Sequence, residues 1–187
     1  MTREEWLLKA IDGLKPLFTE VGESVPDVRV SVGWPGGRGR KDSVIGQAWA
    51  KISAKDGVAQ VFISPVLEDA SRVLDVLAHE LVHVVDENES GHKGRFKQIA
   101  TDIGLTGKMT ATVAGEELKL RLDAMADTLG PYPHSALTPT AKGGPAKQST
   151  RMLKLQAECC GYIVRTTAKW IETGLPSCPC GNQMEVA

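Results

Sequence analysis

The residues best suited to chemistry lie in one apolar stretch near the middle of the chain, residues 74–86. They form the pattern His79-Glu80-x-x-His83. In a helix, side chains four residues apart project from one face, so the two imidazoles can reach a single metal ion. Glu80 follows the first of them, where its carboxylate can accept a proton from a water molecule on the metal. The pattern therefore predicts zinc-dependent hydrolysis of peptide bonds.

The alternative is that the two histidines are polar positions on an ordinary packed helix. The surrounding residues are apolar on almost every side, which indicates that the helix is buried: Val73, Leu74, Val76, Leu77, Leu81, Val82, Val84 and Val85. Buried imidazoles and a buried carboxylate destabilise a fold unless they are paired or bound to a metal. The flanking sequence therefore favours a metal site.

A catalytic zinc ion usually has three protein ligands and one position left for water. His92 is the favoured third ligand, because it follows His83 closely in the chain and imidazole suits zinc. The intervening residues 86–91 are polar and end in glycine, so the chain can turn back toward the metal. Asp102, further along the chain, is the competing ligand.

All four cysteines lie in the last 29 residues, which favours metal binding over a disulfide framework. They form two pairs, Cys159 with Cys160 and Cys178 with Cys180, and glycine follows each pair. Two such turns can supply four thiolates to one structural zinc ion in a zinc-ribbon-like module, whose small core depends on the metal for its stability. The pairs lack the usual two intervening residues, so a disulfide or free thiols remain alternatives.

The composition limits the classes of protein to which the chain can belong. Its 187 residues, 42% of them hydrophobic, suffice for one globular core and a small accessory module. A net charge of −1 gives no overall field that indicates a nucleic-acid or membrane partner. No stretch is long and apolar enough to span a bilayer, and the charged first residues lack the apolar core of a signal peptide. We therefore expect no membrane partner and a cytoplasmic location.

Apolar periodicity predicts an α+β fold around the metal helix, with the three strands in an antiparallel sheet as the simplest arrangement. The expected elements are a helix over 2–18, strands over 26–32, 44–52 and 58–64, the metal helix over 69–87, and helices over 93–103 and from 113 or 115 to 129. Residues 135–150 are rich in Pro, Gly, Ala, Thr and Lys and predict a linker. The expected domains are therefore 1–134 and 151–187.

A glycine-rich loop over residues 33–42 carries three cations, Arg38, Arg40 and Lys41. Such a loop is either a solvated hairpin tip or a grip for the phosphates of a nucleic acid. DNA is therefore a candidate partner, through this loop and the C-terminal module. The corresponding alternative function is a non-catalytic, nucleic-acid-binding zinc protein acting in DNA or transcription processes.

The stretches His79-Glu80-x-x-His83, residues 91–96 and the tail from Cys160 to Cys180 resemble the SprT-like zinc metallopeptidases, and the resemblance spans about residues 26–187. It implies a zincin domain followed by a zinc ribbon, with His79, His83 and His92 as metal ligands and Glu80 as the catalytic base. Eukaryotic members cleave proteins crosslinked to DNA, which implies protein or peptide substrates associated with DNA. The chain departs from the family between Cys159 and Cys160, where two residues are missing.

Overall fold

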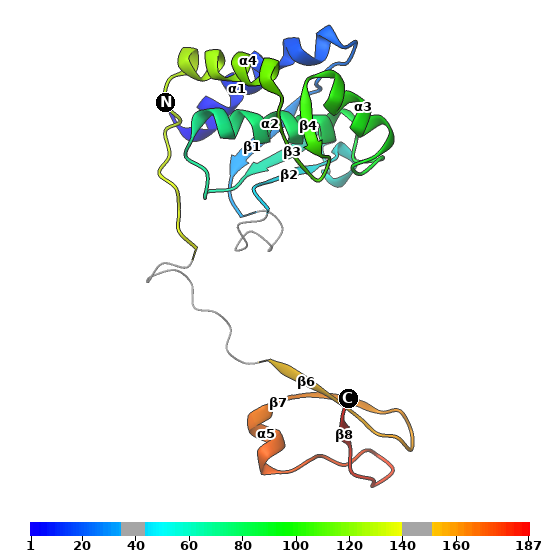
Figure 1. The fold of residues 1–187 in the computed structure, drawn as a ribbon. Coiled ribbons are helices and arrows are strands. Elements are labelled where there is room, and N and C mark those ends of the chain that lie inside the picture. The colour runs from blue at the N-terminus through cyan, green and yellow to red at the C-terminus, as the bar shows by residue number, and fades with distance from the viewer. Residues whose placement is uncertain (35–43, 140–150) are drawn as a thin grey trace. The chain divides into compact units, whose positions relative to one another are not determined.

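The computed structural model describes residues 1–34, 44–139 and 151–187. The chain divides into two compact units, Met1–Thr140 and Ala141–Ala187. Figure 1 shows the elements of each unit. The cationic loop residues Arg38, Arg40 and Lys41 lie outside the described ranges.

The N-terminal unit combines helices with two small sheets, in agreement with the α+β class expected from the sequence. Its elements in chain order are α1 (Arg3–Glu20), β1 (Val28–Val32), β2 (Gly46–Trp49), the 3-10 helix η2 (Lys51–Ser53), β3 (Ala59–Ile63), α2 (Ala70–Val85), α3 (Gly94–Asp102), β4 (Leu105–Lys108), β5 (Ala111–Ala114) and α4 (Glu116–Leu129).

The first sheet is mixed, with strand order β1-β3-β2. β2 is antiparallel to β3, whereas β1 is parallel to β3 in a register that runs from Val28↔Ala59 to Val32↔Ile63. The expected antiparallel arrangement is therefore wrong for β1. The alternating valines of β1 require only one buried face, and a parallel neighbour provides that face as well as an antiparallel one. The chain passes from β1 to the far edge and returns to the centre as β3.

Helix α2 lies between this sheet and α4 (Figure 1). It contributes the largest share of the buried side chains, and Val73, Leu74, Leu77, Ala78, Leu81 and Val82 have no exposed surface. The N-terminal helix α1 packs into the same core through Trp6, Leu14 and Phe18. The metal helix expected from the sequence is thus the central element of the core, which fixes its backbone firmly.

Local signals explain where the two core helices begin. Thr2 caps α1 in a capping box with Glu5, in which each side chain accepts a hydrogen bond from the other residue's backbone amide. Asp69 caps α2 by accepting a hydrogen bond from the backbone amide of Arg72, at 2.8 Å. Helix α1 continues to Glu20, two residues beyond the expected end, although Pro16 lies inside it.

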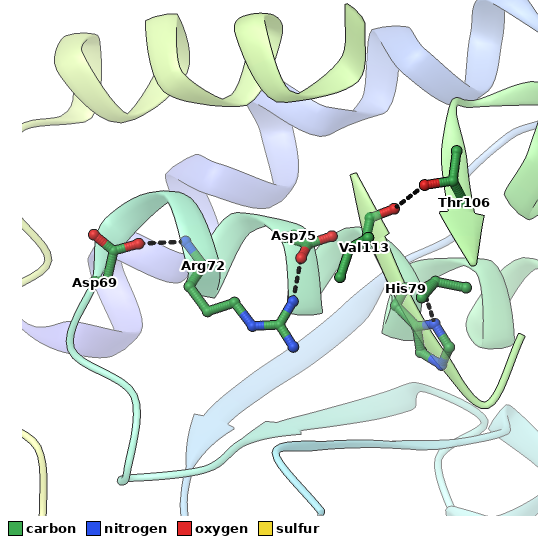
Figure 2. Close-up of polar contacts among 7 residues, drawn as sticks. Asp69, Arg72, Asp75, His79, Thr106 and Val113 are labelled. Atoms are coloured by element: carbon green, nitrogen blue, oxygen red, sulfur yellow. Dashed lines mark hydrogen bonds and ion pairs between the residues drawn. The ribbon is translucent and has the colours of Figure 1, made fainter. Parts of the chain in front are cut away.

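The hairpin formed by β4 and β5 was not expected from the sequence. Its residues are mostly small or polar, so they lack the alternation that marks a strand. The Thr106 hydroxyl donates a hydrogen bond to the carbonyl oxygen of Val113 across the hairpin (Figure 2). Helix α4 consequently begins at Glu116, with Gly115 as its N-cap, close to the later of the two expected starts, residues 113 and 115.

The C-terminal unit is a three-stranded antiparallel sheet with a short helix. Its elements are β6 (Met152–Gln156), β7 (Ile163–Thr167), α5 (Ala168–Thr173) and β8 (Glu185–Val186), and the strand order is β7-β6-β8. Within residues 151–187, which the structure describes, only four residues are buried: Leu155, Ala157, Cys178 and Met184. A core of this size is too small to hold a fold together alone.

Candidate metal centres

The first candidate metal centre begins on α2, where His79 and His83 occupy successive turns. Their ring centroids lie 5.1 Å apart. His83 is buried, with 8% of its surface exposed, and His79 is half-buried. Because α2 is fixed by its apolar neighbours on the other faces, both rings are held toward the same side.

A tight turn after α2 brings His92 to these two rings. Within the turn, Asp86 is buried and accepts hydrogen bonds from the Ser90 backbone amide at 2.9 Å and the Ser90 hydroxyl at 2.7 Å. Glu87, Asn88 and Gly91 in this turn have positive φ. Glycine adopts this conformation without strain, which suits Gly91 to its position. These contacts set the path that returns the chain to α2.

The three histidines form one cluster, in which a ring nitrogen from each lies within 4.8 Å of the others. His83 Nε2 and His92 Nε2 are 3.1 Å apart. Two nitrogen ligands of a tetrahedral zinc ion would be separated by about 3.3 Å, so the spacing fits a shared ion. The competing residue Asp102 ends α3 and lines a different cavity, beside Glu20 and Arg121.

Two neighbouring side chains orient the rings. Thr112 on β5 places its hydroxyl 2.8 Å from His79 Nδ1, which leaves Nε2 of that ring for a metal. Phe96 on α3 packs against all three rings, and its centroid is 4.2 Å from that of His83. The unexpected β4–β5 hairpin therefore has a direct role in positioning His79.

The protonation of the rings suits metal binding. Burial, with smaller contributions from His92 and Arg72, lowers the pKa of His79 to about 4. Burial and the neighbouring histidines lower the pKa of His83 to about 3, and burial also lowers the pKa of His92. At neutral pH all three imidazoles are uncharged, which is the form that coordinates metal ions.

Glu80 lies beside the cluster, in the wall of a cavity of about 520 Å³ that His79, His83 and His92 also line. Only 6% of its surface is exposed, and it has no ion-pair partner among the residues that the structure describes. Burial raises its pKa to about 8, against a smaller opposing effect of the Ala48 backbone. A bound cation would compensate for this desolvation and favour the ionised carboxylate.

The second candidate centre is formed by the four cysteines, whose sulfur atoms lie within 4.8 Å of one another. Cys159 and Cys160 lie in the turn between β6 and β7, and Cys178 and Cys180 lie in the turn before β8. All four are free, and the Sγ atoms of Cys159 and Cys178 are 3.4 Å apart, which is too far for a disulfide bond. The compressed spacing of the pairs therefore still allows four sulfurs to converge.

The environment of Cys178 favours its thiolate. Burial opposes ionisation, but hydrogen bonds from the Cys159 thiol and from the backbone of Asn182 and Cys180 outweigh it and lower the pKa of Cys178 to about 7. A thiolate is the form that binds zinc. The donor sets of both clusters, imidazole nitrogen and thiolate sulfur, are those that zinc takes in proteins.

Comparison of the chain with models of protein families, with curated proteins and with solved structures returns no match. The resemblance to the SprT-like metallopeptidases thus rests on the motif residues themselves. None of the described helices is both long and apolar enough to cross a membrane.

Gly46 belongs to the first centre but was not singled out from the sequence. A Cβ atom at this position on β2 would lie 2.4 Å from Glu80 Oε1 and 2.8 Å from the Val76 side chain. Glycine at position 46 therefore allows β2 to approach α2 beside Glu80, the candidate catalytic base. A glycine inside a strand pattern is a known sign of close backbone approach, so this residue could have been identified. Thr112 lies in a segment with no such signal.

Gly46→Ala is expected to displace Glu80 or push β2 away from α2, because the added carbon has no room. We expect peptide hydrolysis to fall by about 10²-fold, since small misplacements of a reacting group have effects of this size. Steady-state kcat/KM against a fluorogenic peptide measures this effect. Gly33→Ala, in open space just after β1 and outside the cavity lining, is the comparison variant. Equal activity of Gly46→Ala and native protein would contradict the steric argument.

Cys178→Ser combined with Cys180→Ser is expected to unfold the C-terminal unit, because the four buried residues in its described part give too little core without a metal. Zinc content should fall by about one ion per chain. Limited proteolysis followed by mass spectrometry should then show cuts within residues 151–187 and an intact N-terminal unit. Ser177→Ala is the neighbouring control. Protease resistance equal to that of the native chain would show that the unit does not need the thiolates.

Proposed function

We propose that the protein is a zinc-dependent peptidase related to the SprT-like metallopeptidases, and that it acts on protein substrates associated with DNA. The observation that carries the proposal is the convergence of three uncharged imidazoles beside a buried carboxylate, in the wall of one open cavity. A structural zinc site needs no free carboxylate next to the ligands, whereas peptide hydrolysis needs a base there.

His79, His83 and His92 would hold the catalytic ion, and the four cysteines would hold a structural one. When bound, zinc polarises a carbonyl group and lowers the pKa of water. Glu80 then acts as the general base: it accepts the proton of the attacking water and passes it to the leaving amine. Its buried position keeps bulk water from competing for that proton, and Gly46 allows its carboxylate to lie close to β2.

The cavity also suits an extended peptide. Residues 44–48, which include most of the edge strand β2, line it together with residues of α2. Among the described residues, β2 pairs only with β3. A peptide backbone can hydrogen-bond to such an edge, which holds it across the metal without reading its side chains. This arrangement supports a broad rather than a narrow sequence preference.

Zinc dependence tests the proposed function directly. The purified protein should hydrolyse an unfolded protein such as casein, lose that activity when a chelator removes the metal, and regain it when zinc is restored. Mass spectrometry of the products should show cleaved peptide bonds. Hydrolysis that is unaffected by chelation would point to a contaminating or metal-independent activity. A zinc-loaded protein that cleaves no peptide would refute the proposal.

The second candidate function is non-catalytic binding of nucleic acid, and the C-terminal unit provides a reason to test it. Tyr162 and Trp170 are 48% and 60% exposed, and the Lys169 ammonium lies 5.5 Å from the centroid of the Trp170 ring. Exposed rings beside a cation can stack on unpaired bases. On this alternative, binding of single-stranded DNA would weaken steeply with salt and would be unchanged in Glu80→Gln.

A further inference from the structure

One cationic side chain lies in the wall of the catalytic cavity without a place in the chemistry described above. Arg72 is on the first turn of α2, on the same helix face as Val76, His79 and His83. Within the described ranges, it is the only Arg or Lys that lines this cavity. The Arg72 side chain is 37% exposed, so a ligand in the cavity can reach it.

A buried carboxylate holds this arginine in place. Arg72 donates a hydrogen bond through Nη1 to Asp75 Oδ2, and the Asp75 side chain is only 10% exposed. Figure 2 shows the Arg72 side chain extending along α2, with its guanidinium at Asp75 on the way toward His79. A guanidinium has five N–H donors in a planar fork, and this ion pair occupies one nitrogen. The other donors remain for a ligand.

The pair is costly for stability, which makes a purely structural role less satisfactory. Burial raises the pKa of Asp75, although the charge of Arg72 acts in the opposite direction. An apolar residue at this position would avoid the desolvation. What the carboxylate provides instead is a fixed orientation for the guanidinium, which a solvent-exposed arginine would lack.

The guanidinium also lies near the three-histidine cluster, since its positive charge is one cause of the lowered pKa of His79. Seven helix positions separate the backbones of Arg72 and His79, or about 10 Å along the axis, and the Arg72 side chain extends over part of that distance. An extended peptide covers that distance in about three residues. A substrate bound across the three histidines therefore brings a group two or three residues from the scissile bond to Arg72.

We propose that Arg72 is a specificity-determining residue that binds a carboxylate of the substrate near the scissile bond. The carboxylate is either an acidic side chain or a free C-terminus, since both present the same two oxygens to the guanidinium fork. This inference rests on the proposed peptidase function. The inference adds a preference for acidic substrates to a cavity in which β2 would otherwise contact only the peptide backbone.

The test measures binding rather than cleavage, so that its outcome is independent of the proposed catalysis. Short peptides in which a single Glu is moved through every position, each with a Gln counterpart, are titrated against zinc-loaded Glu80→Gln protein by fluorescence anisotropy. Glu at one position should tighten binding about tenfold or more over Gln, as expected for a charge-assisted contact. A second set with free or amidated C-termini distinguishes the two sources of carboxylate.

A variant that removes the Arg72 guanidinium must also neutralise Asp75, because the buried carboxylate would otherwise lose its ion-pair partner. Arg72→Gln with Asp75→Asn replaces the ion pair by two amides that can still hydrogen-bond, and it should reduce the Glu-to-Gln ratio to about one. Arg72→Lys keeps the charge but loses the fork, so its ratio should be intermediate. The matched control is Arg121→Gln with Glu20→Gln, which removes a surface arginine–carboxylate pair outside the cavity.

The inference is overturned if the parent shows no preference for a carboxylate at any position, or if the preference survives in Arg72→Gln/Asp75→Asn. Cleavage by the native protein is scored separately with the same peptides. Cleavage without an Arg72-dependent preference leaves the peptidase proposal standing and removes only the specificity claim. A preference without cleavage identifies a carboxylate-binding cavity and removes the peptidase proposal.

Discussion

Glu80→Gln is expected to abolish peptide hydrolysis while the protein keeps its metal and its fold. The substitution preserves the shape of the side chain and removes only the group that accepts the proton. We expect kcat/KM to fall by about 10²–10⁴-fold, the usual contribution of general acid–base catalysis. The stability of the metal-free protein should change little, because burial raises the Glu80 pKa to about 8 and so favours the uncharged carboxyl group at neutral pH.

The measurement pairs initial rates on a fluorogenic peptide with zinc analysis of the same samples. Glu117→Gln serves as the comparison, since Glu117 lies on the exposed surface of α4 away from the catalytic cavity. Retention of full activity by Glu80→Gln would rule out the mechanism proposed here. Loss of zinc together with activity would instead give this residue a role in metal binding.

His92→Ala is expected to remove the catalytic ion alone. Metal analysis should give about two zinc ions per chain in the native protein and about one in the variant, because two remaining imidazoles hold zinc weakly. His92 lies in a turn rather than in α2, and it is more exposed than His83, so its loss leaves the core intact. Hydrolysis should fall with the zinc content.

The chain contains one further histidine, which makes a suitable control. His134 lies next to the Pro65 carbonyl oxygen and the Arg3 guanidinium, outside the three-histidine cluster. Zinc content in His134→Ala should equal that of the native chain. If His92→Ala also kept both ions, the third ligand would have to be another group and the assignment of His92 would fail.

The grouping of the histidines could be predicted because it depends on local rules. The spacing of His79 and His83 places them on one helix face whatever the helix packs against. The polar residues before His92 could also be read as a turn, although the buried Asp86 that fixes this turn could not.

What could not be predicted depends on contacts between distant segments. The alternation of Val28, Val30 and Val32 specifies a buried face but not a partner strand, so the parallel pairing of β1 with β3 had no local signal. Thr112 contacts His79 from a hairpin whose sequence does not alternate. Arg72 and Asp75 stand at helix spacing in the sequence, but nothing in the sequence indicates that Arg72 lies in the cavity wall.

The hydrogen bonds from Ser90 to Asp86 in the turn before His92 imply that the two candidate metal centres would behave differently when zinc is scarce. Hydrogen bonds from Ser90 to Asp86 help to hold the turn before His92, so we expect the three-histidine site to keep much of its shape when zinc is removed. The C-terminal unit buries only four of its described residues, so we expect loss of its ion to be coupled to unfolding. Zinc starvation would therefore silence the first site reversibly, whereas the second would be exposed to degradation.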